Sequence, residues 1–150
     1  MDIYEYLKMD HQKISDLFKQ FEAAKVFQRK KEIVAMIAQE LTIHANSEED
    51  TFYNLLEMFP ESKEEAVHGE KEHQEIKTKI ASAMKPHDSA AWEEQVKELK
   101  KLVEHHVKEE EGPLFKKAKK VISTEESYAI KEKMHHLKGL LLLDYQARVN

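Results

Sequence analysis

Two segments of the chain place a histidine and a glutamate four residues apart. HANSEEDTFY carries His44 and Glu48, and HHVKEEEGPLF carries His106 and Glu110 at the same spacing. Residues four apart lie on one face of a helix, with roughly 5–6 Å between their β-carbons. Imidazole nitrogens and carboxylate oxygens bind divalent cations. Each pair can therefore supply two ligands to one metal ion.

Four histidines of the chain fall in phase with the apolar stripe of an amphipathic helix. Such inward positions are normally apolar, and an ionisable group there is costly unless a partner replaces its lost hydration. A single inward histidine is usually a hydrogen-bonded core or surface residue. Four on four helices, two of them followed by an inward glutamate, instead favour a metal centre. The predicted ligands are His11, His44, Glu48, His73, His106 and Glu110.

The other five histidines do not share this pattern. His105 is the nearest competitor to His106, but it and Glu109, four residues on, are rotated roughly 100° away from the stripe. We therefore expect surface positions for all five. They are His68, His87, His105, His135 and His136.

The composition is typical of one helical domain. The chain has 150 residues, of which 41% are hydrophobic and 35% charged, with only three glycines and three prolines. This length suits a single domain, and the composition favours long helices joined by short loops. We predict one all-α domain over residues 1–150, an antiparallel up-down four-helix bundle (about 2–120) with an additional C-terminal helix (about 123–148).

Helix start and stop signals support this division. The first helix begins at a capping-box spacing and runs to about residue 24, and the second, without a strong cap, keeps helical spacing until Pro60. The third should end near Met84, and the fourth should break or kink at Gly112-Pro113. The predicted capping residues are Asp2, Ser62, Asp88 or Ser89, and Ser123.

Composition also argues against several classes of protein. Cysteine is absent, which excludes disulfides, iron–sulfur clusters and thiolate zinc sites. The net charge of -5 argues against a nucleic-acid-binding module, because phosphate binding needs clustered positive charge. The N-terminal segment is acidic where a signal peptide would be basic and then apolar. We expect a cytoplasmic protein that does not span a membrane.

With these residues in place, the chain resembles the hemerythrin-like, HHE cation-binding family. The resemblance covers about residues 2–120 and rests on DHQKISDLF, ELTIHANSEEDTFY, KEHQEIK and HHVKEEEGPLF. Members of the family bind two non-haem irons inside an antiparallel four-helix bundle. The resemblance implies one iron on His11 and His44, a second on His73 and His106, and bridging roles for Glu48 and Glu110.

Two departures separate the chain from the oxygen carriers of that family. The carriers have a second histidine four residues after the third-helix one, where this chain has Lys77. They also have an aspartate five residues beyond the fourth-helix histidine, whereas this chain has Glu110 at four and Glu111, rotated off the face, at five. The chain is therefore more similar to the subgroup that includes iron- and oxygen-responsive regulatory domains.

A ligand count predicts open positions on the iron pair. Two histidines and one oxygen from each bridging carboxylate give each iron four protein ligands, so an octahedral ion keeps two positions open. An oxo or hydroxo bridge and a small ligand such as O2, NO or peroxide fit there. Glu70 is an additional candidate, because it lies three residues before His73, as in ferritin-like di-iron helices. It would fill a position, orient His73, or remain solvated.

The leading hypothesis is a di-iron-binding protein that binds or senses O2, NO or iron. One alternative is an oxidoreductase acting on peroxide or another oxidant, although the sequence displays no electron-donor surface or substrate path. Another is an iron-responsive interaction module that signals to a separate protein partner through its C-terminal helix. The oligomeric state stays open, because the stripe of that helix either covers the bundle or forms a dimer surface.

Overall fold

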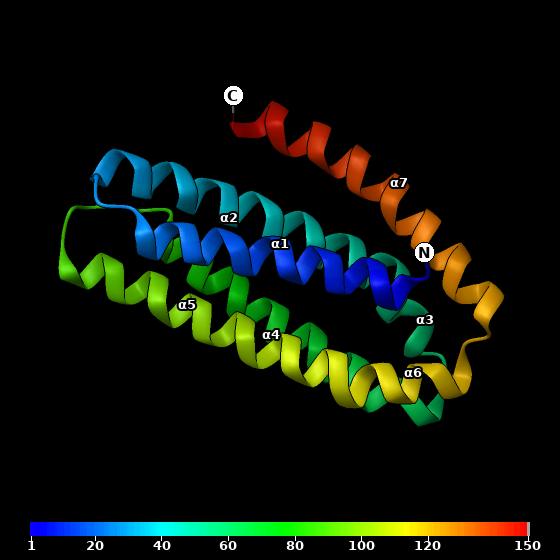
Figure 1. Ribbon diagram of the computed structural model, residues 1–150. Helices are drawn as coiled ribbons and strands as arrows, with labels where there is room; N and C mark the ends of the chain where they lie inside the picture. The colour runs from blue at the N-terminus through cyan, green and yellow to red at the C-terminus, as the bar shows by residue number, and fades with distance from the viewer. Residues whose placement is uncertain (150) are drawn as a thin grey trace.

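The chain folds into an all-helical bundle, and the computed structural model describes residues 1–149 of it. Consecutive long helices run in opposite directions, and a further helix lies outside them (Figure 1). The all-α prediction and the C-terminal addition are thereby confirmed. The long helices of the bundle are α1 (Ile3–Ala23), α2 (Phe27–Glu48), α4 (Pro60–Ala83) and α5 (Ala90–Glu109). The remaining elements are η1 (Glu49–Tyr53), α3 (Asn54–Leu56), η2 (Glu110–Leu114), α6 (Phe115–Val121) and α7 (Thr124–Val149).

Side-chain caps start three of the helices as predicted. The Asp2 carboxylate accepts from the Glu5 amide at 2.9 Å, and the Ser89 hydroxyl accepts from the amide of Trp92 at 3.2 Å. A reciprocal capping box joins Ser123 and Glu126 at the start of α7. These hydrogen bonds satisfy backbone amides that lack a partner in the first helical turn.

The predicted cap at Ser62 is wrong. Helix α4 begins at Pro60, because proline has the φ of a first helical turn and no amide to leave unsatisfied there. Ser62 lies inside that turn, and its buried hydroxyl donates to the Leu56 carbonyl at 2.7 Å. It therefore ties the start of α4 to the end of α3.

Of the break or kink predicted at Gly112-Pro113, the break does not occur. Residues 110–114 form a π-helical turn, η2, that contains Pro113 and continues into α6. A second π-helical turn, η1, directly follows Glu48. Hydrogen bonds in such a turn run from residue i to i+5, and single π turns are common at functional sites. Both helices that carry a predicted glutamate ligand thus widen at that glutamate.

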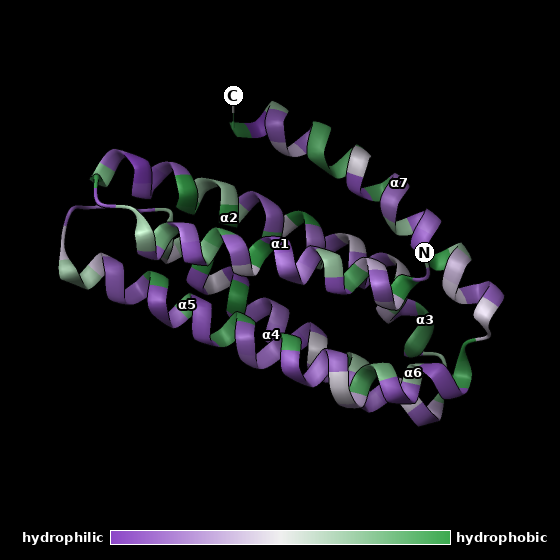
Figure 2. Ribbon diagram, viewed as in Figure 1, coloured by the Kyte–Doolittle hydropathy of each residue, from purple (hydrophilic) through white to green (hydrophobic). Residues whose placement is uncertain are grey.

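Two apolar clusters fill the bundle, and a polar layer separates them along each long helix. One cluster includes Ile14, Ile37 and Trp92, and the other includes Leu7 and Phe52. Hydrophobic positions recur along all the long helices (Figure 2). The residues between the two clusters on α1, α2, α4 and α5 are the predicted metal ligands and their neighbours. The apolar clusters therefore hold this layer in place from both ends.

Helix α7 packs on the outside of the bundle. It contacts α1, α2 and η1 through a stripe on which Ile130 and Met134 are buried and Leu137 and Leu141 half-buried. Near its C-terminal end, Tyr145 and Val149 line one cavity together with Ala35, Met36 and Gln39 of α2. None of the described helices combines the length and the apolar composition needed to cross a membrane.

Candidate metal centre

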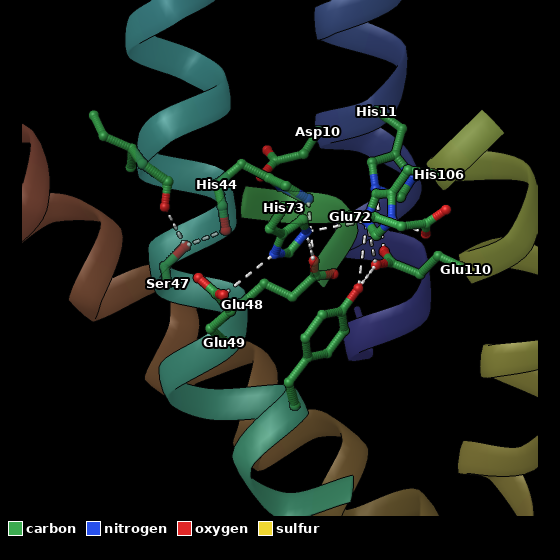
Figure 3. Close-up of polar contacts among 12 residues, drawn as sticks. Asp10, His11, His44, Ser47, Glu48, Glu49, Glu72, His73, His106 and Glu110 are labelled. Atoms are coloured by element: carbon green, nitrogen blue, oxygen red, sulfur yellow. Dashed lines mark hydrogen bonds and ion pairs between the residues drawn. The ribbon is translucent and has the colours of Figure 1, made fainter. Parts of the chain in front are cut away.

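The structure brings all six predicted ligands together in the polar layer. Each is buried, and Figure 3 shows their side chains directed toward one another from different helices. Helix α1 supplies His11, α2 supplies His44 and Glu48, α4 supplies His73, and α5 with η2 supplies His106 and Glu110.

The ligand atoms form two overlapping groups. Within each group, all candidate ligand atoms lie within 4.8 Å of one another. Two histidines belong to each group alone, and both glutamates belong to both groups. The groups are His11, His44, Glu48 and Glu110, and Glu48, His73, His106 and Glu110.

The two glutamates span the groups. Glu48 Oε1 lies 3.6 Å from His44 Nε2 and 3.2 Å from His73 Nε2. Glu110 Oε1 lies 3.2 Å from His11 Nε2, and its Oε2 lies 3.2 Å from His106 Nε2. This is the same division into pairs, with the same two shared carboxylates, that the family resemblance implied.

The unpartnered atoms of the centre suit cations. Within residues 1–149, no hydrogen-bond partner is found for the Nε2 atoms of His11 and His44, both Glu48 oxygens and Glu110 Oε1. A buried polar atom without a partner costs about 1–3 kcal/mol. All of these atoms are electron-pair donors that bind divalent metal ions. Their burial, types and convergence therefore fit a pair of such ions.

Two carboxylates orient histidines of a neighbouring helix. Asp10 Oδ2 accepts a hydrogen bond from His44 Nδ1 at 2.9 Å, and Glu72 Oε1 accepts one from His106 Nδ1 at 2.8 Å. A proton on Nδ1 leaves Nε2 free to face the centre. Ligating histidines usually have such an outer partner, which fixes the ring and raises its basicity.

Two further carboxylates face the remaining histidines. Glu111 Oε2 is 2.6 Å from His11 Nδ1, and Glu49 Oε1 is 3.7 Å from His73 Nδ1. Each directly follows one of the shared glutamates in the sequence. Each of the four site histidines thus faces one outer carboxylate. The sequence analysis assigned none of these carboxylates a role.

Lysines tie two of the outer carboxylates to the rest of the fold. Lys138 of α7 donates to both Asp10 oxygens at 2.7 Å. Lys77, at the position of the carriers' extra histidine, donates to Asn46 Oδ1 at 2.7 Å and to Glu49 Oε2 at 3.3 Å. Lys77 therefore cannot act as a ligand, and it supports the partner of His73 instead.

The carboxylates control the protonation of two histidines. Burial alone would lower the pKa of His11, but Glu110 and Glu111 outweigh it and raise this pKa to about 10. Burial is likewise outweighed at His106, where Glu110 and Glu72 raise the pKa to about 10. Without a cation, these two imidazoles therefore hold protons at neutral pH. A metal ion would have to displace them.

Burial is the largest influence on the pKa of three other ligands. It lowers the pKa of His44 and of His73 despite their carboxylate partners. It also raises the pKa of Glu48 well above the ordinary value, with the charge of Glu110 adding to the effect. Burial would also raise the pKa of Glu110, but its contacts to His106 and His11 outweigh burial and lower this pKa well below its ordinary value. The pKa values of the two shared carboxylates are thus shifted in opposite directions.

Tyr53 also belongs to the centre, and the sequence analysis did not identify it. Its buried hydroxyl donates to Glu110 Oε2 and lies 3.4 Å from His106 Nε2, and its ring stacks on His73 at 5.2 Å. A Cβ added to Gly69 would lie 2.7 Å from this hydroxyl, so only glycine leaves room for it. Tyr53 follows Glu48 by five residues, and the i to i+5 geometry of η1 keeps it near the same face.

Glu70 joins neither group of ligands. It is half-buried, and burial together with the nearby Glu57 carboxylate raises its pKa to about 7. The residue that faces His73 Nδ1 is Glu49. All five histidines expected at the surface are exposed there.

Two cavities border the centre. One of about 20 Å³ is lined by all four site histidines and by aliphatic side chains such as Ile14, Leu41 and Val103. A space of this size holds about one water-sized molecule. The other, about 320 Å³, includes Tyr53, His106 and Glu110 in its lining together with exposed residues of α4. The centre therefore adjoins a small cavity and a larger one that reaches exposed residues.

Comparison with known proteins identifies the family. Residues 2–118 match the Hemerythrin HHE cation binding domain. The chain belongs to this family, so the resemblance inferred from the sequence is confirmed. A crystal structure of a Hemerythrin HHE cation binding domain-containing protein from Mycobacterium kansasii has a TM-score of 0.81 to the chain. It is 23% identical and covers 97% of this chain and 93% of its own, which shows a shared fold.

A longer relative contains a similar segment. A DNA nickase from Nostoc sp. is 27% identical over 128 residues, which are 85% of this chain. The matched segment is 36% of the nickase, so the chain spans only about a third of that relative's length.

Proposed function

We propose that the chain holds two non-haem iron ions at the candidate centre and uses their open positions to bind or sense O2, NO or iron. The observation that carries this proposal is the pair of overlapping groups, each with two histidines and two shared glutamates. Bound iron would supply redox chemistry and affinity for small diatomic ligands. A cytoplasmic location is part of the same proposal.

The residues around the centre favour a small, uncharged ligand. The cavity of about 20 Å³ is lined by the four histidines and by aliphatic side chains. The aliphatic part of this lining, with side chains such as Ile14, Leu41 and Val103, offers no charged group to an ionic ligand, and the small volume excludes a larger one. The outer carboxylates hold Nδ1 of the histidines, which leaves their Nε2 atoms directed inward.

Aerobic purification with metal analysis and optical spectroscopy tests this function. We expect about two irons per chain and a near-ultraviolet band that changes when O2 or NO is added to the anaerobically reduced protein. Peroxide added under the same conditions separates sensing from turnover, because a sensor returns to its starting spectrum only when the ligand is removed. Zinc alone, at one site per chain, would contradict the proposal.

One observation favours an oxidoreductase as the second candidate. Burial raises the pKa of Tyr53 well above 10, and the charges of Glu110 and Glu48 add to this effect. Its hydroxyl therefore keeps a proton beside the ligand atom of His106, next to a cavity open to solvent. A proton donor at this place suits the reduction of peroxide, in which the departing oxygen must be protonated.

Replacement of the donor separates the two candidates. If the protein turns over peroxide, Tyr53→Phe should lower the turnover number by about 100-fold, because general acid catalysis contributes about this much. Its iron content should stay unchanged. Turnover would be measured as the consumption of peroxide in the presence of a defined reductant. Tyr4→Phe is the matched control, since Tyr4 is also buried but contacts aromatic rings outside the centre. Equal turnover in both variants would exclude Tyr53 as the donor.

DNA cleavage is not part of this proposal. The Nostoc relative contains far more chain than the segment matched here. A cavity of about 680 Å³ beside α1 and α5 is lined by both lysines and glutamates, and two of these lysines, Lys30 and Lys100, are paired with Glu93 and Glu22. The net charge of -5 also argues against binding to a phosphate backbone, which needs clustered positive charge.

A further inference from the structure

A second set of histidines and glutamates lies on the surface, next to the buried centre. His68 Nε2 is 3.0 Å from Glu109 Oε2 and 3.5 Å from Glu72 Oε2. His105 Nε2 contacts the same two residues, at 3.0 Å from Glu109 Oε1 and 3.4 Å from Glu72 Oε2. Candidate ligand atoms of His68, Glu72 and Glu109 all lie within 4.8 Å of one another.

The surface set repeats the spacing of the buried ligands. His68 and Glu72 are four residues apart on α4, and His105 and Glu109 are four apart on α5. The same spacing places His44 with Glu48 and His106 with Glu110. Two such pairs on adjacent helices offer two imidazole nitrogens and several carboxylate oxygens to one ion. Both surface histidines are more than half exposed, so they can move to complete the coordination.

Glu72 connects the surface set to the buried centre. Its Oε1 accepts from Nδ1 of the buried ligand His106 at 2.8 Å, while its Oε2 faces His68 and His105. Only 9% of Glu72 is exposed, so its position is fixed by the two helices. An ion at the surface would share this carboxylate with a ligand of the buried centre.

The open cavity of about 320 Å³ runs between the two sites. Five of its lining residues are glutamates, and no lysine or arginine of the described chain is among the lining residues. Glu65 is paired with Lys117 at 2.6 Å, which leaves a negative balance that favours cations. The lining includes His68, Glu72 and Glu109 near the surface and Tyr53, His106 and Glu110 at the centre.

We infer that His68, Glu72, His105 and Glu109 form a third site, which binds a divalent cation at the mouth of this cavity and is the first stop for iron on its way to the buried centre. The site itself is independent of the proposed function, whereas its role in loading rests on it. Four N and O ligands suit Zn²⁺ as well as Fe²⁺, so Zn²⁺ is a suitable probe.

Equilibrium dialysis of the metal-free protein against Zn²⁺ tests the site. We expect about three ions per wild-type chain and about two in the His68→Ala/His105→Ala variant. His87→Ala/His136→Ala is the matched control, because it also removes two exposed histidines and should keep about three. Equal Zn²⁺ binding by the wild type and the His68→Ala/His105→Ala variant would overturn the inference.

A second variant separates this inference from the proposed function. Glu48→Gln changes only the buried centre and should still bind about one Zn²⁺, which the added His68→Ala/His105→Ala changes should remove. If the wild type itself binds only that one ion, the buried centre fails as a metal site while the surface site stands. If the added His68→Ala/His105→Ala changes remove no ion, the surface site is refuted, whether or not the buried centre binds metal.

The loading role has its own measurement. Anaerobic Fe²⁺ is added, free and loosely held iron is removed by a chelator at timed intervals, and retained iron is measured. We expect the His68→Ala/His105→Ala variant to load the centre about tenfold more slowly than the wild type, to the same final content. An unchanged rate would overturn the entry role.

Discussion

Chelation of the bound metal is expected to lower the midpoint of thermal unfolding by roughly 8–16 °C. A bound ion stabilises the folded state by about 4 kcal/mol when its free concentration is 1,000 times the dissociation constant. For a domain of this length, each kcal/mol shifts the midpoint by about 2–4 °C. Removal of the metal costs folding stability because Glu48 and its neighbours in the centre would remain buried without partners, between two apolar clusters.

Differential scanning calorimetry on iron-loaded and chelated protein measures this shift. Anaerobic return of Fe²⁺ should restore the midpoint, and magnesium should not, because it prefers oxygen ligands and retains its water. An unchanged midpoint in protein shown to have lost its iron would mean that the polar layer is stable by itself. The centre would then contribute nothing to folding.

The helices could be predicted because their signals are local. Capping residues such as Asp2 and Ser123 hydrogen-bond within their own first turn, and the inward stripes follow from helical periodicity. The start of α4 was missed because Pro60, as first helical residue, makes a cap at Ser62 unnecessary. The two π-helical turns were missed because their widening is imposed by the packing around them, and periodicity assumes a uniform helix.

The candidate ligands could be predicted for the same reason, and their partners could not. His11 and His73 lie on the inward stripe of their own helices, where a polar residue is conspicuous. Asp10 and Glu72 precede them by one residue, a rotation of roughly 100° that makes them look like surface residues. Each instead meets a histidine of the neighbouring helix. The arrangement of the helices shows these contacts directly. In the sequence, the acidic residue directly before each of these two histidines was a usable signal.

Glu48→Gln is expected to remove nearly all iron from the centre while making the metal-free protein more stable. Glu48 belongs to both ligand groups, and an amide cannot supply the bridging negative charge, so iron should fall from about two per chain to a small fraction of one. Metal analysis of variant and wild type purified in parallel measures this. The change is nearly isosteric, which avoids a cavity in the core.

The stability of the metal-free variant depends on pH with a predictable sign. Burial, with the charge of Glu110, raises the pKa of Glu48 well above its ordinary value of 4.5. The unfolded chain therefore loses this proton first, and the metal-free wild type loses stability as the pH rises above 4.5. Glutamine cannot lose a proton, so the advantage of the variant should grow between about pH 5 and pH 8. Chemical denaturation across this range measures the difference.

Glu70→Gln is the matched control for the loss of iron. Glu70 lies three residues before His73 and is half-buried, but it belongs to neither ligand group. Its pKa of about 7 gives it a pH dependence of the same sign, without a role in binding. We therefore expect Glu70→Gln to keep about two irons. Iron retained by Glu48→Gln but lost by Glu70→Gln would move the bridging role to Glu70.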